Sequence, residues 1–468
     1  MTPAAPADAV GPVRLSAYRP TREDVRTLFA LAAPVAMVQI GLMSMGAIDT
    51  VMVGRVSPTD LAAVAIGNLY FFGIAMFGMG MLYALDPVIA QGVGASDTEA
   101  VARGVQRGLV LAAVLAGVAM LLLVPAGRLL TLARQPIDVV PVANEYAHGL
   151  ILGMLPFYGF IVLRQSLQAM TRVRPILVTV VVGNLVNVFL NWVLIFGNLG
   201  VSPMGAVGSA WGSSLSRWFI LLMLAVVSWS DLRSALLPPR RGVLALAPLA
   251  RFVRVGAPIG AQQWLEYGVF GAAGLLMGLL GTIAIGSHQV ALQLAALTFM
   301  IPVGVAQATS VVVGQAVGRE DPAGARRAVG AGVAAATAFM SFTAVMFLTV
   351  PTPLARLFSN DPTVVVATAA LLPIAGVFQV FDGLQVSAAG ALRGIGDTRV
   401  PMLLTLVGFW VIGLPACVFL GFRLDLGPRG VWWGLALGIG VVAILLMHRI
   451  RRRFGRELRR LVIDEDHA

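Results

Sequence analysis

The chain has 468 residues, of which 58% are hydrophobic and only 12% are charged, and its mean hydropathy is +0.88. A soluble domain carries roughly 25% charged residues, so this composition excludes an ordinary soluble protein and predicts one solvated by lipid. The net charge of +11 would suit a nucleic-acid-binding protein, but the arginines are spread over the ends and connections of apolar stretches. No nucleic-acid partner is therefore expected.

Twelve apolar stretches follow one another, and a spanning helix needs about 20 apolar residues. Residues 1–26 come first, with four arginines and no short apolar core before a small-residue cleavage site, and are expected to be a cytoplasmic tail rather than a signal peptide. Residues 449–468 are expected to be a second cytoplasmic tail. The predicted spans are 28–53, 61–85, 106–126, 143–163, 176–197, 206–229, 252–279, 284–312, 327–350, 365–390, 400–421 and 430–448.

The basic residues are distributed unevenly between the two ends of these spans. All 33 are arginine. With an even number of helices, both termini and most arginine-rich connections lie on one side. The opposite side has only Arg55, Arg128, Arg134, Arg356, Arg423 and Arg429, while Arg164 and Arg217 fall inside spans. The positive-inside rule therefore predicts that both termini are cytoplasmic.

The two halves of the chain repeat each other. A shift of 224 residues places Pro34 on Pro258 and Gln91 on Gln315, and later in each half a shift of 222 places the motif of Gly208 and Gly212 on that of Gly430 and Gly434. Six helices per copy return the chain to the side where it entered, so the repeats are expected to be parallel. The predicted lobes are residues 27–230 and 252–448, joined by an arginine-rich cytoplasmic linker at 231–251.

Acidic and amide side chains gather within the spans of the second half. A charge at the bilayer centre costs roughly 2.5 to 3.5 kcal/mol on insertion scales, so such groups usually face the protein interior. Asp382 and Glu266 are the mid-span acids of this half and are expected to lie close together. Their polar neighbours in sequence, expected to line a cavity, are Gln379 and Gln385 around Asp382, Gln262 and Gln263 before Glu266, and His288, Gln289 and Gln293 on the next helix.

A second polar pocket is expected in the first half. Asn184, Asn187 and Asn191 follow helical spacing along one span, and Asp49 lies late in the first span. Two interpretations stay open for the asparagines, because polar residues also hold helices together by bonding one another.

These residues lie in motifs that resemble the multidrug and toxic compound extrusion family, in particular its NorM-like bacterial branch. The motifs are GAIDTVMVGRVSPTDLAAVAIG with Asp49, DPVIAQGVGASD, APIGAQQWLEYGVF with Glu266, and FQVFDGLQVSAAGALRGIGDTRVP with Asp382. The resemblance runs from about residue 25 to 450. The chain departs from it at Phe378, where some members have a tyrosine, so one hydroxyl ligand for sodium is missing.

The resemblance implies an all-α membrane protein of twelve helices, in two parallel six-helix repeats that form a V-shaped pair of lobes. It implies that Glu266 and Asp382 bind the coupling cation, and that the pocket of Asp49, Asn187 and Asn191 responds to protonation. The expected function is secondary active antiport of organic cations by a monomer in the bacterial plasma membrane. A proton is the expected coupling ion, with sodium as the alternative; no metal site is expected beyond one for sodium at Glu266 and Asp382, and no cofactor.

Two other functions compete with export. An enzyme or an ATP-driven pump is disfavoured because a chain without lysine has no P-loop lysine and no Schiff-base lysine. A flippase for lipid-linked oligosaccharides would share the overall fold by resemblance. Its cavity would be expected to be strongly cationic, whereas the polar residues here are acidic, which suits lipophilic cations.

Overall fold

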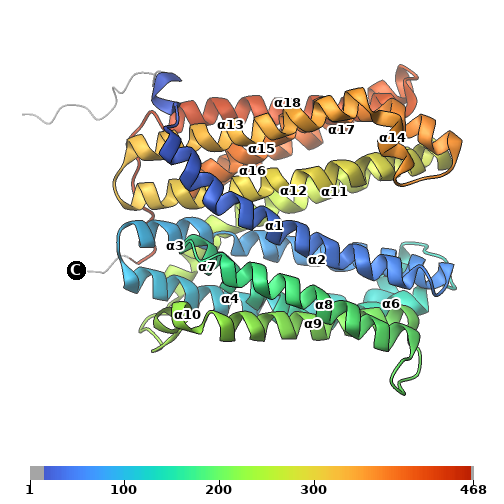
Figure 1. Ribbon diagram of the computed structural model, residues 1–468, viewed down its shortest axis with the longest axis horizontal. Coiled ribbons are helices and arrows are strands. Elements are labelled where there is room, and N and C mark those ends of the chain that lie inside the picture. The colour runs from blue at the N-terminus through green and yellow to red at the C-terminus, as the bar shows by residue number, and fades with distance from the viewer. Residues whose placement is uncertain (1–14, 465–468) are drawn as a thin grey trace, which may run out of the picture. The chain divides into compact units, whose positions relative to one another are not determined.

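The computed structural model describes residues 15–464, and all regular elements in that range are helices (Figure 1). Helices before the middle of the chain are η1 (Leu15–Tyr18), α1 (Arg22–Val53), α2 (Pro58–Leu82), α3 (Leu85–Gly94), α4 (Thr98–Leu123), α5 (Ala126–Leu132), α6 (Val140–Ile151), α7 (Met154–Ala169), α8 (Arg174–Phe196), α9 (Gly205–Val227) and α10 (Trp229–Leu236). The others are α11 (Leu246–Leu279), α12 (Thr282–Gly318), α13 (Pro322–Thr349), α14 (Pro351–Arg356), α15 (Pro362–Gly394), α16 (Arg399–Thr405), η2 (Leu406–Gly413), α17 (Leu414–Val418), η3 (Phe419–Arg423) and α18 (Gly427–Arg453).

The described residues pack as two units. Unit 1 contains residues 15–32, Gly94–Ser96 and Val269–Leu461, and unit 2 contains Ala33–Val93, Asp97–Gly268 and Val462–Asp464. In unit 1, α15 packs against α12, α13 and α18; in unit 2, α9 packs against α6, α7 and α8. The chain passes from unit 2 to unit 1 inside α11, while the lobes expected at 27–230 and 252–448 stay a prediction.

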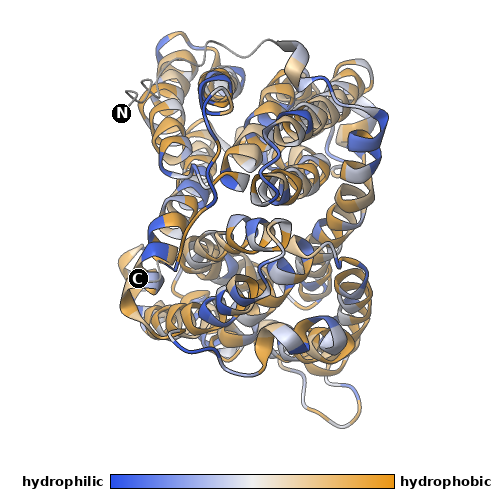
Figure 2. Ribbon diagram, turned by 90° about the vertical axis from the view of Figure 1, so that its left-hand side faces the viewer, coloured by the Kyte–Doolittle hydropathy of each residue, from blue (hydrophilic) through white to orange (hydrophobic). Residues whose placement is uncertain are grey.

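All twelve expected spans fall on helices. By length and composition, ten helices in the described range could each cross a membrane, or eleven if α6 and α7, which meet at a bend of 49°, form one broken span. The expected span at 252–279 lies on α11, which is not among these. Gln262, Gln263 and Glu266 lower its hydropathy, so the polar residues of the expected site themselves weaken the membrane signal. Figure 2 shows hydrophobic residues on most of the helical ribbon.

Repeated glycines hold a helix close to its neighbour in each unit. In unit 2, α8 and α9 lie side by side (Figure 1), and a Cβ atom added at Gly208 would come within 2.5 Å of the carbonyl oxygen of Leu194. In unit 1, a Cβ atom at Gly430 would come within 2.5 Å of the carbonyl carbon of Leu420. Glycines four residues apart let helix backbones approach in membranes. The repeated motif found in the sequence is therefore a repeated close contact between helices.

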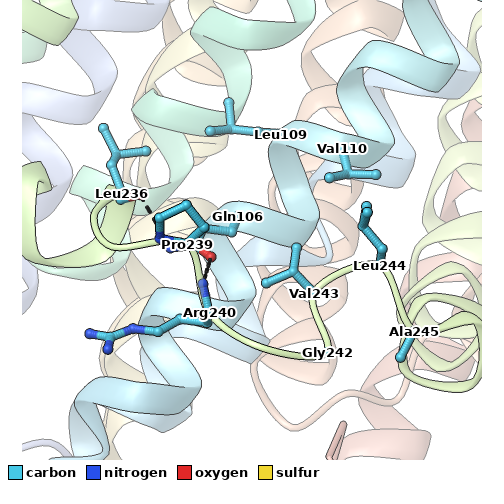
Figure 3. A pocket seen from close by; sticks show the side chains of 10 residues that line it. All are labelled: Gln106, Leu109, Val110, Leu236, Pro239, Arg240, Gly242, Val243, Leu244 and Ala245. Carbon is cyan, nitrogen blue, oxygen red and sulfur yellow. Dashed lines mark hydrogen bonds between the residues drawn. The ribbon is translucent and has the colours of Figure 1, made fainter.

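One end of α4 holds the end of α10, the segment that follows it and the last described residues. The amide nitrogen of Gln106 lies 3.0 to 3.2 Å from the carbonyl oxygens of Ala235, Leu236 and Pro238, and its oxygen accepts the backbone N–H of Arg240 at 2.8 Å (Figure 3). Beside this contact is a hollow of about 630 Å³, lined partly by residues of this segment. Asp464 pairs with Arg103 at 2.9 Å and with Arg107 at 2.6 Å.

Candidate functional site

Asp49 lies in a network of hydrogen bonds between three helices of unit 2. The Nδ2 atom of Asn191 on α8 donates to its Oδ1 at 2.5 Å, and the hydroxyl of Ser213 on α9 donates to its Oδ2 at 2.7 Å. Asn191 Nδ2 also lies 3.4 Å from Oδ1 of Asn187, one turn earlier on α8. Asp49 is 6% exposed and both asparagines are fully buried. The structure therefore brings together the acid and two amides that the sequence predicted as a pocket.

Asn184, the third asparagine of the stripe, bonds elsewhere. Its Nδ2 donates to the carbonyl oxygens of Gly41 on α1 at 3.0 Å and of Val180 at 2.9 Å. A Cβ atom at Gly41 would come within 2.7 Å of a methyl group of Val180, so α1 and α8 are close here. In this structure Asn184 thus joins α1 to α8, as in the helix-packing interpretation left open for the stripe.

Two groups beside this network had no role assigned from the sequence. Tyr146 on α6 is buried and donates its hydroxyl to Oδ1 of Asn68 on α2 at 3.0 Å. Arg217 is one turn after Ser213 on α9 and interacts electrostatically with Asp49 and Tyr146. The sequence carried a signal for Arg217, because a charged arginine inside a predicted span needs a partner in the protein interior.

Glu266 lies on α11 in unit 2. Gln262, one turn earlier on the same helix, donates its amide to Glu266 Oε1 at 3.0 Å and is 6% exposed. Gln263 packs differently, because its side chain lies against α2 at Gly80, where an added Cβ atom would be 3.0 Å from Gln263 Cγ. The helical spacing thus predicted one of the two glutamines as the neighbour of this acid.

Asp382 lies on α15 in unit 1 and is 8% exposed. Gln379 and Gln385, the expected neighbours on its helix, are buried. The side-chain Oε1 atom of Gln379 accepts a hydrogen bond from the hydroxyl of Thr343 on α13 at 2.8 Å. The side-chain Nε2 atom of Gln379 donates to the hydroxyl of Thr298 on α12. The polar face of α15 is therefore joined to α12 and α13 by side-chain hydrogen bonds.

Aromatic rings cover the helix turn before Asp382. Phe378 is 2% exposed and makes edge-on contacts with Trp432 on α18, with ring centroids 5.9 Å apart, and with Phe270 on α11 at 6.0 Å. His288 on α12 is fully buried and also meets Trp432 edge-on at 5.7 Å. Its ring nitrogens have no hydrogen-bond partner among the described residues. Gln289 and Gln293 lie one turn apart on the exposed face of the same helix.

Glu266 and Asp382 belong to different units, so their expected proximity stays a prediction. Within the described residues, no group of three or more histidine, cysteine, aspartate or glutamate side chains is arranged to hold a metal ion.

The helices and the buried acids define a multi-pass membrane protein with ionisable groups inside its bundle. Residues 34–193 and 258–419 each match the family model MatE, and the chain belongs to this family. The starts of the two matches are 224 residues apart, the same shift that relates the two halves of the sequence. The family expected from the motifs is confirmed.

Among curated relatives, the chain is 38% identical over 460 residues to the probable multidrug resistance protein NorM of Rhodopseudomonas palustris, covering 95% of both chains. It is 36% identical over 465 residues to multidrug resistance protein PmpM of Pseudomonas aeruginosa, covering 96% of both. These matches place it in the NorM-like branch.

Solved structures show the same fold at low sequence identity. The crystal structure of the eukaryotic MATE transporter AtDTX14 matches with a TM-score of 0.86 at 22% identity, covering 93% of this chain and 98% of that one. An outward-facing MATE family transporter of the MOP superfamily matches with a TM-score of 0.82 at 22% identity, covering 94% and 97%. The all-helical fold class expected from the sequence is confirmed.

Proposed function

We propose that this protein is a secondary active multidrug exporter that exchanges organic cations for protons. The observation that carries the proposal is the buried carboxylate of Asp49, held by Asn191 and Ser213 within the helices of a membrane protein. Relatives 36 to 38% identical over almost the whole chain carry the name multidrug resistance protein. Both support export as the function.

The mechanism rests on a change of charge at buried carboxylates. When Asp49 is ionised, it accepts hydrogen bonds from the amide of Asn191 on α8 and the hydroxyl of Ser213 on α9. Taking up a proton removes the charge and turns one carboxylate oxygen into a donor, so the contacts between α1 and its neighbours must change. Alternating access couples such local changes to movement of the repeats around a central site.

Asp382 and Glu266 are the proposed coupling acids outside this network, and sodium is the alternative ion for them. Carboxylate and amide oxygens suit a hard cation, yet Phe378 offers an apolar ring one turn before Asp382. An inward-moving unit charge gains roughly 2.3 kcal/mol per 100 mV of membrane potential, so either ion would supply energy. We favour the proton because Asp49 adds a separate protonatable group.

The proposed location is the bacterial plasma membrane, where a monomer spans the lipid with both termini in the cytoplasm. The excess of arginine on the side of the termini supports this orientation. Exposed leucine, valine and phenylalanine side chains along the helices support contact with lipid.

The first test is export itself. Cells that lack their own exporters would express the protein and be loaded with ethidium or another fluorescent organic cation. Expression should lower the accumulation of the dye, and a proton uncoupler should raise the accumulation again. Unchanged accumulation across a broad panel of cations, with insertion confirmed in membrane fractions, would contradict export.

The second test addresses coupling through Asp382. Asp382→Asn keeps the size of the side chain but cannot change charge, so we expect concentrative efflux to be lost while the protein still inserts and folds. Glu457→Gln is the matched control, because the same chemical change is made at an exposed acid. Efflux by the Asn variant at the normal rate would exclude Asp382 from the coupling site.

The third test separates the two ions. In proteoliposomes, a pH gradient without sodium should drive movement of the cation. Transport that needs a sodium gradient and ignores the pH difference would overturn proton coupling but not antiport.

A further inference from the structure

The guanidinium of Arg217 lies inside unit 2 between aromatic rings from two helices. Its Cζ atom is 4.4 Å from the ring centre of Phe71 on α2 and 5.2 Å from that of Phe157 on α7. The two rings meet edge-on with centroids 5.8 Å apart. Aromatic faces attract a cation, and the attraction strengthens when water is excluded. The rings therefore fix where the positive charge lies.

The same arginine faces the network of Asp49. Arg217 follows Ser213 by one turn of α9, and Ser213 donates to Asp49 at 2.7 Å, so both side chains leave the same face of the helix. Arg217 interacts electrostatically with Asp49. Its Nη1 atom is buried and has no hydrogen-bond partner in the described part of the chain.

Within residues 15–464, the electrostatic partners of Asp49 and Arg217 include no further charged side chain. Tyr146 on α6 is the one additional titratable group, and its hydroxyl is engaged with Asn68. The groups that the packed helices present are otherwise uncharged: Asn68 and Phe71 from α2, Phe157 from α7, Asn187 and Asn191 from α8, and Ser213 from α9.

We propose that Arg217 is the built-in counter-ion of Asp49, which favours the ionised form of this carboxylate and so shifts the pH range of transport. The proposal rests on the proposed function for its transport readout. It follows from the geometry because Arg217 leaves the same face of α9 as Ser213, which bonds Asp49, and a positive charge on that side of a buried carboxylate favours its ionised form. Arg217 acts through Asp49 and is thus a positioning residue.

The test compares the pH profile of transport in Arg217 variants. In Arg217→Met the carboxylate loses its counter-ion. A neighbouring opposite charge shifts the pH at which a carboxylate takes up its proton by about 1 to 3 units. The pH of half-maximal transport should therefore move toward alkaline values by about 1 unit or more. Arg217→Lys keeps the charge and should keep the wild-type profile. Arg459→Met, at an exposed arginine, is the matched control and should also behave as wild type.

A purely structural role predicts a different result. If Arg217 only packs between the rings, Arg217→Met should lower the amount of folded protein or the maximal rate without moving the pH profile, and that outcome would overturn the proposal. Arg217→Gln is the second neutral variant in case the methionine variant does not accumulate, and a wild-type profile for it would have the same meaning.

A second measurement does not need transport. Infrared spectra of the purified protein in lipid should show a protonated carboxyl band that disappears in Asp49→Asn. This band should appear at higher pH in Arg217→Gln than in wild type. An equal titration would overturn the counter-ion role, whereas absence of transport by the wild type would count only against the proposed function.

Discussion

Gly434→Ala tests the close contact between α18 and α17. The added Cβ atom would lie 2.6 Å from Cα and 2.7 Å from Sγ of Cys417, and it would also meet the Cys417 backbone nitrogen. Non-bonded carbon atoms pack at about 3.5 to 4.0 Å, so the two helices must separate by about 1 Å. Backbone atoms cannot rotate away as a side chain can.

The expected cost follows from two opposing effects. Forcing an extra methyl group into a packed core costs about 1 to 3 kcal/mol, and alanine gains about 1 kcal/mol over glycine in a helix. We therefore expect a net destabilisation of up to about 2 kcal/mol. Gly274→Ala on α11 is the control, because nothing lies within 4 Å of an added Cβ atom. It should leave stability unchanged or raise it.

The purified variants are heated in one detergent, and the folded protein that remains at each temperature is measured as the height of its peak in size-exclusion chromatography. Gly434→Ala should lose its folded peak at a lower temperature than wild type, and Gly274→Ala should not. Equal melting of the two variants would refute the reasoning, because the contact with Cys417 would then carry no cost.

Two further changes test contacts of unit 2. Gly212→Ala places a Cβ atom 2.5 Å from Oδ1 of Asn191, so the side-chain amide that bonds Asp49 must move. We expect slower transport with little change in melting temperature. Normal transport would show that this position of the amide is not needed. Gln106→Leu removes the contacts with the backbone around Pro238 and should speed tryptic cleavage after Arg240 in detergent. Gln135→Leu, at a partly exposed glutamine, should not. Equal cleavage of the two variants would mean that Gln106 does not hold this segment.

The sequence predicted the fold well because membrane solvation and duplication both leave simple signals. Apolar length located every span on a helix, and one constant shift revealed the repeat that the two family matches share. The weakest span was at α11. Its glutamines and Glu266 reduce the apolar signal, so a helix that carries a polar site resembles a membrane span less than its neighbours do.

The candidate site was predictable only in part. Helical spacing gave the face on which Asn184, Asn187 and Asn191 lie, but not what each one meets: two are in the network of Asp49, and Asn184 bonds the carbonyl of Gly41. Ser213 was not predicted because a serine in a span carries no signal of its partner on another helix. Contacts between distant helices depend on packing, which periodicity does not encode.

The glycine contacts also bear on how the two halves came to differ. Gly212 and Gly434 occupy equivalent places in the repeat, yet the first faces the amide of Asn191 and the second faces Cys417. After duplication, the narrow approach of two helices offers a fixed position, and a single substitution there changes the chemistry without altering the scaffold. In one copy that position holds an amide that binds a carboxylate, and in the other a thiol that donates to the carbonyl of Val431. Specialisation of the two halves is thus concentrated at places where the backbone leaves least room for variation.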